Sequence, residues 1–70
     1  MTIHYSMTIQ WSDEDQVYIV SFPEWGGLLH THGDSYAEAV KNGQELLEGL
    51  VQSRRQHGEP LPAPRIYATA

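Results

Sequence analysis

The hydrophobic pattern of this chain changes its period once, and that change limits the folds it can adopt. Over residues 3–11 apolar and polar residues alternate, which is typical of a β-strand with one buried face. Over residues 36–51 the apolar residues instead recur three and four positions apart, which is typical of a helix with one buried side. The order of the two periods predicts an α+β domain in which strands precede one long helix.

Three strands are predicted before the helix, over residues 3–11, 17–22 and 28–32. The second is apolar on both faces except at Ser21, which predicts a central position in an antiparallel sheet. A single helix covers only one face of such a sheet. Apolar surface on the other face therefore remains for another subunit or another protein.

The helix is predicted to begin after Ser35 and to run for about 20 residues. Ser35 followed by Glu38 is the capping-box pattern, and Gly58 followed by Pro60 is a stop signal. Gly43 falls on the apolar side, where the lack of a side chain would let the helix lie close to the sheet, whereas Gly49 has no such explanation.

A short fourth strand is predicted over residues 65–68. It follows an extended segment after the helix that is stiffened by Pro60, Pro62 and Pro64, which we call the return segment. A right-handed crossover would place this strand parallel to the first and beside it, in the spatial order 3-2-1-4. The expected fold is β-β-β-α-β, a small antiparallel sheet with the helix packed on one face.

The chain has 70 residues and no cysteine, so we expect one domain over residues 1–70 whose small core has neither disulfides nor a thiolate metal site. Formation of a homo-oligomer is the remaining way to add buried surface. The sequence shows neither a signal-peptide pattern nor a membrane-spanning run, and we expect a cytoplasmic protein.

Nine acidic residues against four basic ones give a net charge of -5. Binding to nucleic acid depends largely on Lys and Arg contacts to phosphate, so direct binding of DNA or RNA is not expected. An acidic surface suits a basic protein partner instead, because complementary charge speeds the encounter.

Two histidines in the third predicted strand are the candidate metal ligands. His30 and His32 are two residues apart and face the same side, and His4 is a conceivable third ligand. One interpretation is therefore a small metal-binding, ligand-binding or hydrolytic domain. The favoured interpretation is an exposed histidine pair, and we expect no cofactor and no enzyme activity, because no serine lies in a nucleophile-elbow motif.

An acidic turn and a loop tryptophan are the candidate partner-binding residues. Asp13, Glu14 and Asp15 are predicted to form a solvated turn, and Glu24 is expected to extend the same acidic edge. Trp25 either folds back onto the sheet or serves as an aromatic anchor for a partner. Trp11 is expected in the core.

Short segments along nearly the whole chain, taken in their order and spacing, resemble the HicB-like antitoxin family. They are residues 5–7, 10–15, 18–20, 22–24, 31–39 and 58–62. The resemblance implies a partial ribonuclease-H-like fold, the N-terminal type of HicB domain. It also implies a function in a type II toxin–antitoxin system, in which the antitoxin covers a small basic ribonuclease toxin, HicA.

The chain departs from the usual family pattern in three ways. These residues include no helix-turn-helix or ribbon-helix-helix domain, so we expect protein binding rather than operator binding. The predicted strands carry no Asp or Glu, so the carboxylate set of ribonuclease H cannot be placed on them. Gly26 stands where the family usually has proline, which changes the loop expected to face the partner.

Overall fold

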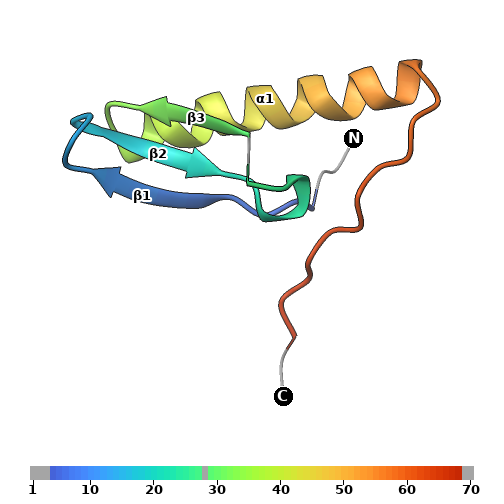
Figure 1. The fold of residues 1–70 in the computed structure, drawn as a ribbon, viewed down its shortest axis with the longest axis horizontal. Helices are drawn as coiled ribbons and strands as arrows, with labels where there is room; N and C mark the ends of the chain where they lie inside the picture. The colour runs from blue at the N-terminus through green and yellow to red at the C-terminus, as the bar shows by residue number, and fades with distance from the viewer. Residues whose placement is uncertain (1–3, 28, 69–70) are drawn as a thin grey trace.

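The computed structural model describes residues 4–27 and 29–68 and consists of a small sheet followed by one long helix (Figure 1). Three antiparallel strands form the sheet in the order β1-β2-β3, and a short 3-10 helix, η1, follows β2. In chain order the elements are β1 (Thr8–Ser12), β2 (Val17–Ser21), η1 (Pro23–Trp25), β3 (His30–Gly33) and α1 (Tyr36–Gln56). The α+β class, the three strands and the helix are therefore confirmed.

The strands are shorter than predicted, while the central position of β2 is confirmed. β1 begins at Thr8 and β3 at His30; residues 3 and 28, where two of the predicted strands begin, lie outside the described part of the chain. In the register of the sheet Ile9 lies opposite Val20, and Gln10 lies opposite Ile19. The two apolar residues of β2 thus face opposite sides of the sheet, as its sequence predicts.

The side of the sheet that carries Val20 is the one covered by α1. Val20 and Phe22 are fully buried there, against Ala39 and Leu47 of the helix. A Cβ atom at Gly43 would lie 2.5 Å from the Met7 sulfur and 3.3 Å from Val20 Cγ1. The close approach of the helix at this glycine, expected from its place on the apolar side, is confirmed.

Both ends of the helix follow the predicted signals. The Ser35 hydroxyl accepts a hydrogen bond from the Glu38 N–H at 3.1 Å, while the Glu38 carboxylate accepts one from the Asp34 N–H. At the other end Gly58 has a φ of 64°, and the Glu59 N–H donates to a carbonyl of the last helical turn. This left-handed glycine ends the helix as expected.

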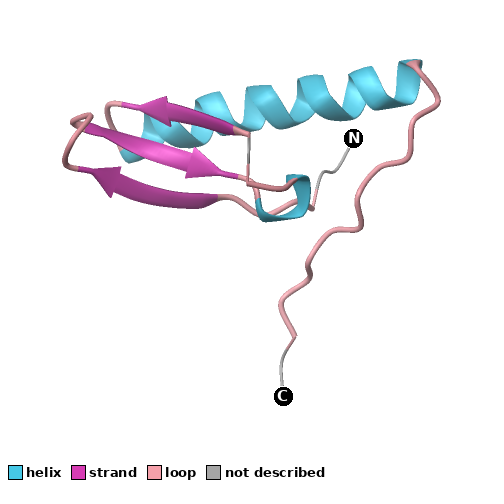
Figure 2. Cartoon of the chain, viewed as in Figure 1, coloured by secondary structure: helices cyan, strands magenta, loops and turns pink. Residues whose placement is uncertain are grey.

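The predicted fourth strand is wrong. Residues 57–68 contain no strand, and the C-terminal end of the described chain runs away from the sheet (Figures 1 and 2). The reason lies in the preceding return segment: the Arg54 guanidinium donates to the Pro60 carbonyl at 2.9 Å, and the Tyr5 hydroxyl donates to the Pro62 carbonyl at 2.6 Å. The first contact holds Pro60 beside the helix end, and the second holds Pro62 beside the segment that precedes β1. The return segment is fixed by these two contacts, and residues 65–68 do not run along β1.

No helix in the described part of the chain is long and apolar enough to span a bilayer.

Candidate protein-binding surface

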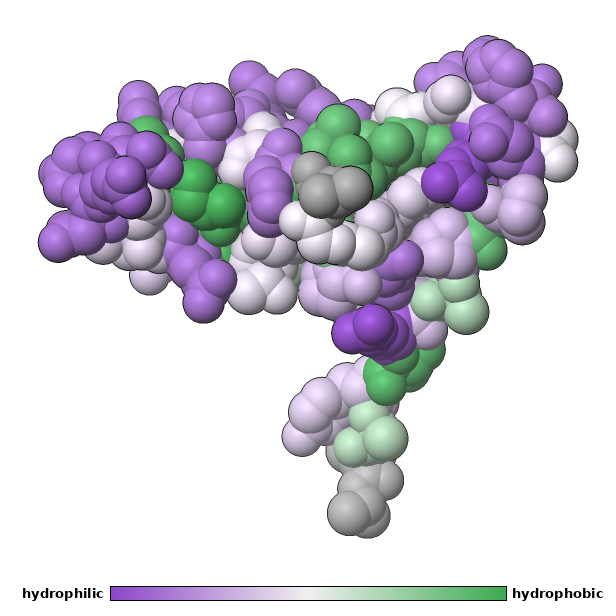
Figure 3. All heavy atoms as spheres, viewed as in Figure 1, coloured by the Kyte–Doolittle hydropathy of each residue, from purple (hydrophilic) through white to green (hydrophobic). Residues whose placement is uncertain are grey.

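The turn between β1 and β2 and the turn between β3 and α1 lie at the same end of the molecule, because β1 and β3 run in the same direction on either side of β2 (Figure 1). Both turns carry exposed carboxylates. We call this region the acidic end. Hydrophilic side chains gather over it in the space-filling view (Figure 3). Its acidic residues are Asp13, Glu14, Asp15, Asp34 and Glu38.

Short-range hydrogen bonds fix the first of these turns. The Asp15 N–H donates to the Ser12 hydroxyl at 3.2 Å, and the side-chain amide of Gln16 donates to the Asp13 carbonyl at 2.7 Å. The Asp13 carboxylate accepts a bond from the Trp11 indole N–H at 3.1 Å. The predicted acidic turn is confirmed, and hydrogen bonds from its own side chains hold its backbone.

A row of three aromatic rings borders the acidic end. The Trp11 and Tyr18 rings pack edge to face with centroids 5.1 Å apart, and the Tyr18 and Tyr36 rings are 4.4 Å apart. Trp11 is 49% exposed and Tyr36 is 64% exposed. We call these three residues the aromatic row. Exposed, mutually supported rings of this kind are the side chains that carry binding energy in protein interfaces.

The prediction that Trp11 belongs to the core is wrong. Helix α1 packs mainly against β3 and β2. The part of β1 that contains Trp11 is therefore left uncovered on the face of the sheet that carries Val20. Trp11 pairs with Tyr18 in the register and stays half exposed beyond the edge of the helix. Tyr36, the first residue of α1 and part of its predicted apolar side, is likewise exposed.

Partial desolvation, followed by the proximity of Tyr36, raises the pKa of Tyr18. A tyrosine is neutral at physiological pH even at its ordinary pKa of about 10, and this shift moves its ionisation further away. A neutral phenol at the centre of the aromatic row adds hydrogen-bonding capacity without adding to the negative charge of the acidic end.

Glu24 does not share a surface with the acidic turn, contrary to the predicted acidic edge. It follows β2 while Asp13 precedes it, so the strand separates the two. The Glu24 carboxylate accepts hydrogen bonds from the Ser6 N–H at 3.1 Å and from the Arg65 N–H at 2.8 Å. Burial raises its pKa, but these hydrogen bonds outweigh burial and leave the pKa below the ordinary glutamate value.

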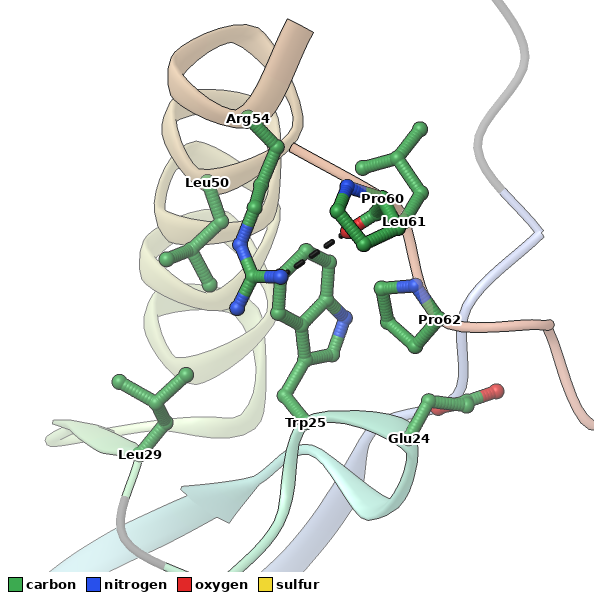
Figure 4. A pocket seen from close by; sticks show the side chains of 8 residues that line it. All are labelled: Glu24, Trp25, Leu29, Leu50, Arg54, Pro60, Leu61 and Pro62. Atoms are coloured by element: carbon green, nitrogen blue, oxygen red, sulfur yellow. Dashed lines mark hydrogen bonds between the residues drawn. The ribbon is translucent and has the colours of Figure 1, made fainter. Parts of the chain in front are cut away.

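Trp25 folds back onto its own chain. Its ring packs edge to face on Tyr5 at 5.3 Å. The Arg54 guanidinium lies 5.3 Å from the centre of the ring (Figure 4). Pro60 and Pro62 also line the hollow of about 340 Å³ beside it. The Trp25 ring thus packs between the end of β2 and the return segment. Its role as a partner anchor stays a prediction.

The two strand histidines face the uncovered side of the sheet together, as predicted. The register places His32 beside Ile19 and His30 beside Ser21, whose hydroxyl is 3.3 Å from His30 Nδ1. His4 is exposed ahead of β1. Within the described residues no three His, Cys, Asp or Glu side chains are grouped so that they could hold a metal ion. The structure thus does not assemble the third ligand that the metal interpretation needs.

The sequence identified the acidic turn but missed the aromatic row. One signal was present in the sequence. Trp11 and Tyr18 lie on either side of the turn, at positions that the hairpin register places opposite each other. The contribution of Tyr36 depends on the angle of the helix, which no local pattern gives. In comparisons with known proteins, no family model, no curated protein and no solved structure matches this chain.

Proposed function

We propose that this chain is a protein-binding module of the HicB-like antitoxin type, which masks a small basic ribonuclease of the HicA type. One observation carries the proposal: the aromatic row, in which Trp11 and Tyr36 are exposed, borders the acidic end. Aromatic side chains with a charged rim are the usual composition of a protein interface. The resemblance of the sequence to HicB-like antitoxins supplies the kind of partner.

The charge of the module supports a basic partner. The net charge is -5, and five of the nine acidic residues lie at the acidic end. Opposite charge accelerates the encounter of two proteins, while desolvated aromatic contacts slow their separation. The carboxylates would therefore speed the association with the toxin, and the aromatic rings would slow its dissociation.

The test is direct binding of the purified chain to a purified HicA-like toxin, together with an assay of RNA cleavage by that toxin. We expect a stoichiometric complex and loss of cleavage. Trp11→Ala should raise the dissociation constant about thirtyfold, since an interface aromatic contributes about 2 kcal/mol.

Leu61→Ala is the matched control, because Leu61 is also a large exposed apolar residue but lies on the return segment. It should leave the dissociation constant unchanged. Thermal unfolding of both variants should remain close to that of the parent chain. Absence of a complex, or equal weakening by the two substitutions, would contradict the proposal.

A further inference from the structure

The two edges of the sheet differ in how far they are protected. At the β3 edge the Asn42 side-chain amide of α1 donates to the His32 carbonyl at 2.7 Å. Gly33 is so close to the helix that a Cβ there would lie 2.7 Å from Ala39 Cα. The helix therefore occupies the His32–Gly33 end of the β3 edge, where it hinders pairing with another strand.

The β1 edge is open. β1 pairs only with β2, and in the described part of the chain no hydrogen bond outside that ladder involves the backbone of residues 8–11. The sequence TIQWS of this strand contains no proline and no charge, the two devices with which exposed strand edges usually avoid pairing. A five-residue edge of this kind readily accepts an added strand.

The C-terminal arm, residues 63–68, carries two adjacent strand-forming residues, Ile66 and Tyr67, and pairs with no strand in the described part of the chain. After Pro64 it contains no proline or glycine, and Ile66 is 67% exposed and Tyr67 is 89% exposed. β-branched and aromatic residues of this kind favour extended pairing. These two adjacent residues leave apolar surface that an added strand could bury.

The base of the arm is already held in place. The Arg65 N–H donates to the Glu24 carboxylate, which the Ser6 N–H also contacts. Beyond this point the arm runs away from its own sheet (Figure 1). Its own β1 could be reached only by a turn at Arg65, whereas the β1 of another molecule can receive the arm as it stands.

We propose that the C-terminal arm adds as a strand to the open β1 edge of a second copy of this chain, and that the second copy returns its own arm. Reciprocal exchange closes the assembly as a two-fold dimer. Since neighbouring residues of a strand face opposite sides, either Ile66 or Tyr67 then lies on the face of the sheet that carries Ile9 and Val20, in any register. The predicted fourth strand would thus exist between molecules.

The first test is sedimentation equilibrium of the full chain over a range of concentrations. We expect a dimer, and the double variant Ile66→Asp with Tyr67→Asp should raise its dissociation constant at least about tenfold. A chain ending at Arg65, which keeps the contact with Glu24, should be monomeric. The matched control is Val17→Thr with Ile19→Thr on the uncovered face of the sheet, which should leave the dimer intact.

The second test distinguishes exchange from closure within one molecule. The chain has no cysteine, so a Gln10→Cys chain can be mixed under oxidising conditions with an Ile66→Cys chain and, separately, with a Tyr67→Cys chain. In either register one of the two arm cysteines lies on the Gln10 side of the sheet. Exchange predicts a disulfide that joins the two different chains in preference to like chains. A monomeric parent chain, a dimer that survives loss of the arm, or a disulfide that forms only when both cysteines are in one chain would overturn the proposal.

Discussion

At the scale of single residues, two glycines that look alike in the sequence have opposite roles. A Cβ at Gly33 would press against the Ala39 backbone, whereas nothing lies within 4 Å of a Cβ at Gly49. Gly33→Ala is expected to lower the free energy of unfolding by about 3 kcal/mol, since backbone cannot move aside. Gly49→Ala should raise it by about 1 kcal/mol through helix propensity alone.

Chemical denaturation of the two variants and of the parent chain measures both changes. Both variants replace glycine by alanine, so the chemical change is the same. The difference between them therefore separates the cost of close packing at Gly33 from the gain in helix propensity at Gly49. A stabilising Gly33→Ala would show that the helix does not lie against β3 as described.

Trp25→Ala should act mainly on the fold. The ring contacts Tyr5 and Arg54, so its removal leaves a cavity between β2 and the return segment. We expect the free energy of unfolding to fall by about 3 kcal/mol. Thermal unfolding checks this, with Trp11→Ala as the matched exposed tryptophan, which should cost less than about 1 kcal/mol. Equal losses from the two substitutions would contradict the described burial.

At the scale of elements, one carboxylate joins the N-terminal segment, η1 and the C-terminal arm. Because hydrogen bonds hold the pKa of Glu24 below its ordinary value, the ionised form stabilises the fold. This contribution is complete above the unfolded-state pKa of about 4.3 and is lost as pH falls through the lower folded-state value. Neutralising Glu24 should therefore release the Arg65 N–H in acid.

The amide resonance of Arg65 is the probe. Its chemical shift should titrate with a midpoint below that of ordinary glutamates, and Glu24→Gln should remove the transition. Glu59→Gln, which changes an exposed glutamate of the return segment, should leave the titration in place. A midpoint at or above the ordinary glutamate value would show that the arm is not held by this carboxylate.

At the scale of the whole molecule, the position of the charge should matter more than its total. Changing Asp13, Glu14 and Asp15 to Lys should slow association with a basic HicA-like toxin by at least about tenfold and weaken its dependence on salt. Changing Glu45, Glu48 and Glu59 to Lys alters the net charge equally but away from the acidic end.

Stopped-flow association rates at several salt concentrations compare the two triple variants. The second variant should retain most of the parent's rate, since its charges lie outside the acidic end. Identical rates for both would mean that only net charge steers the encounter, and that the acidic end is not the binding surface.

Local features of this protein follow from its sequence because they depend on few neighbouring residues. Ser35 and Glu38 mark the start of the helix, and Gly58 marks its end, through hydrogen bonds within one turn. The alternation of β1 and the two-sided apolar character of β2 likewise predict a three-stranded sheet with β2 at its centre. The acidic turn is closed by its own side chains.

Which of the two tryptophans is exposed and which packs against the chain, by contrast, is decided by the tertiary structure. Trp11 alternates as a core residue does, yet it is half exposed because α1 lies over β2 and β3. Trp25 stands in a loop, yet it packs against Tyr5 because the return segment passes beside it. The fourth strand failed for the same reason: contacts between residues distant in the chain, such as Arg65 with Glu24, decide where an extended segment runs. Local periodicity gives the conformation a segment favours, and only the packing of the whole chain gives its neighbours.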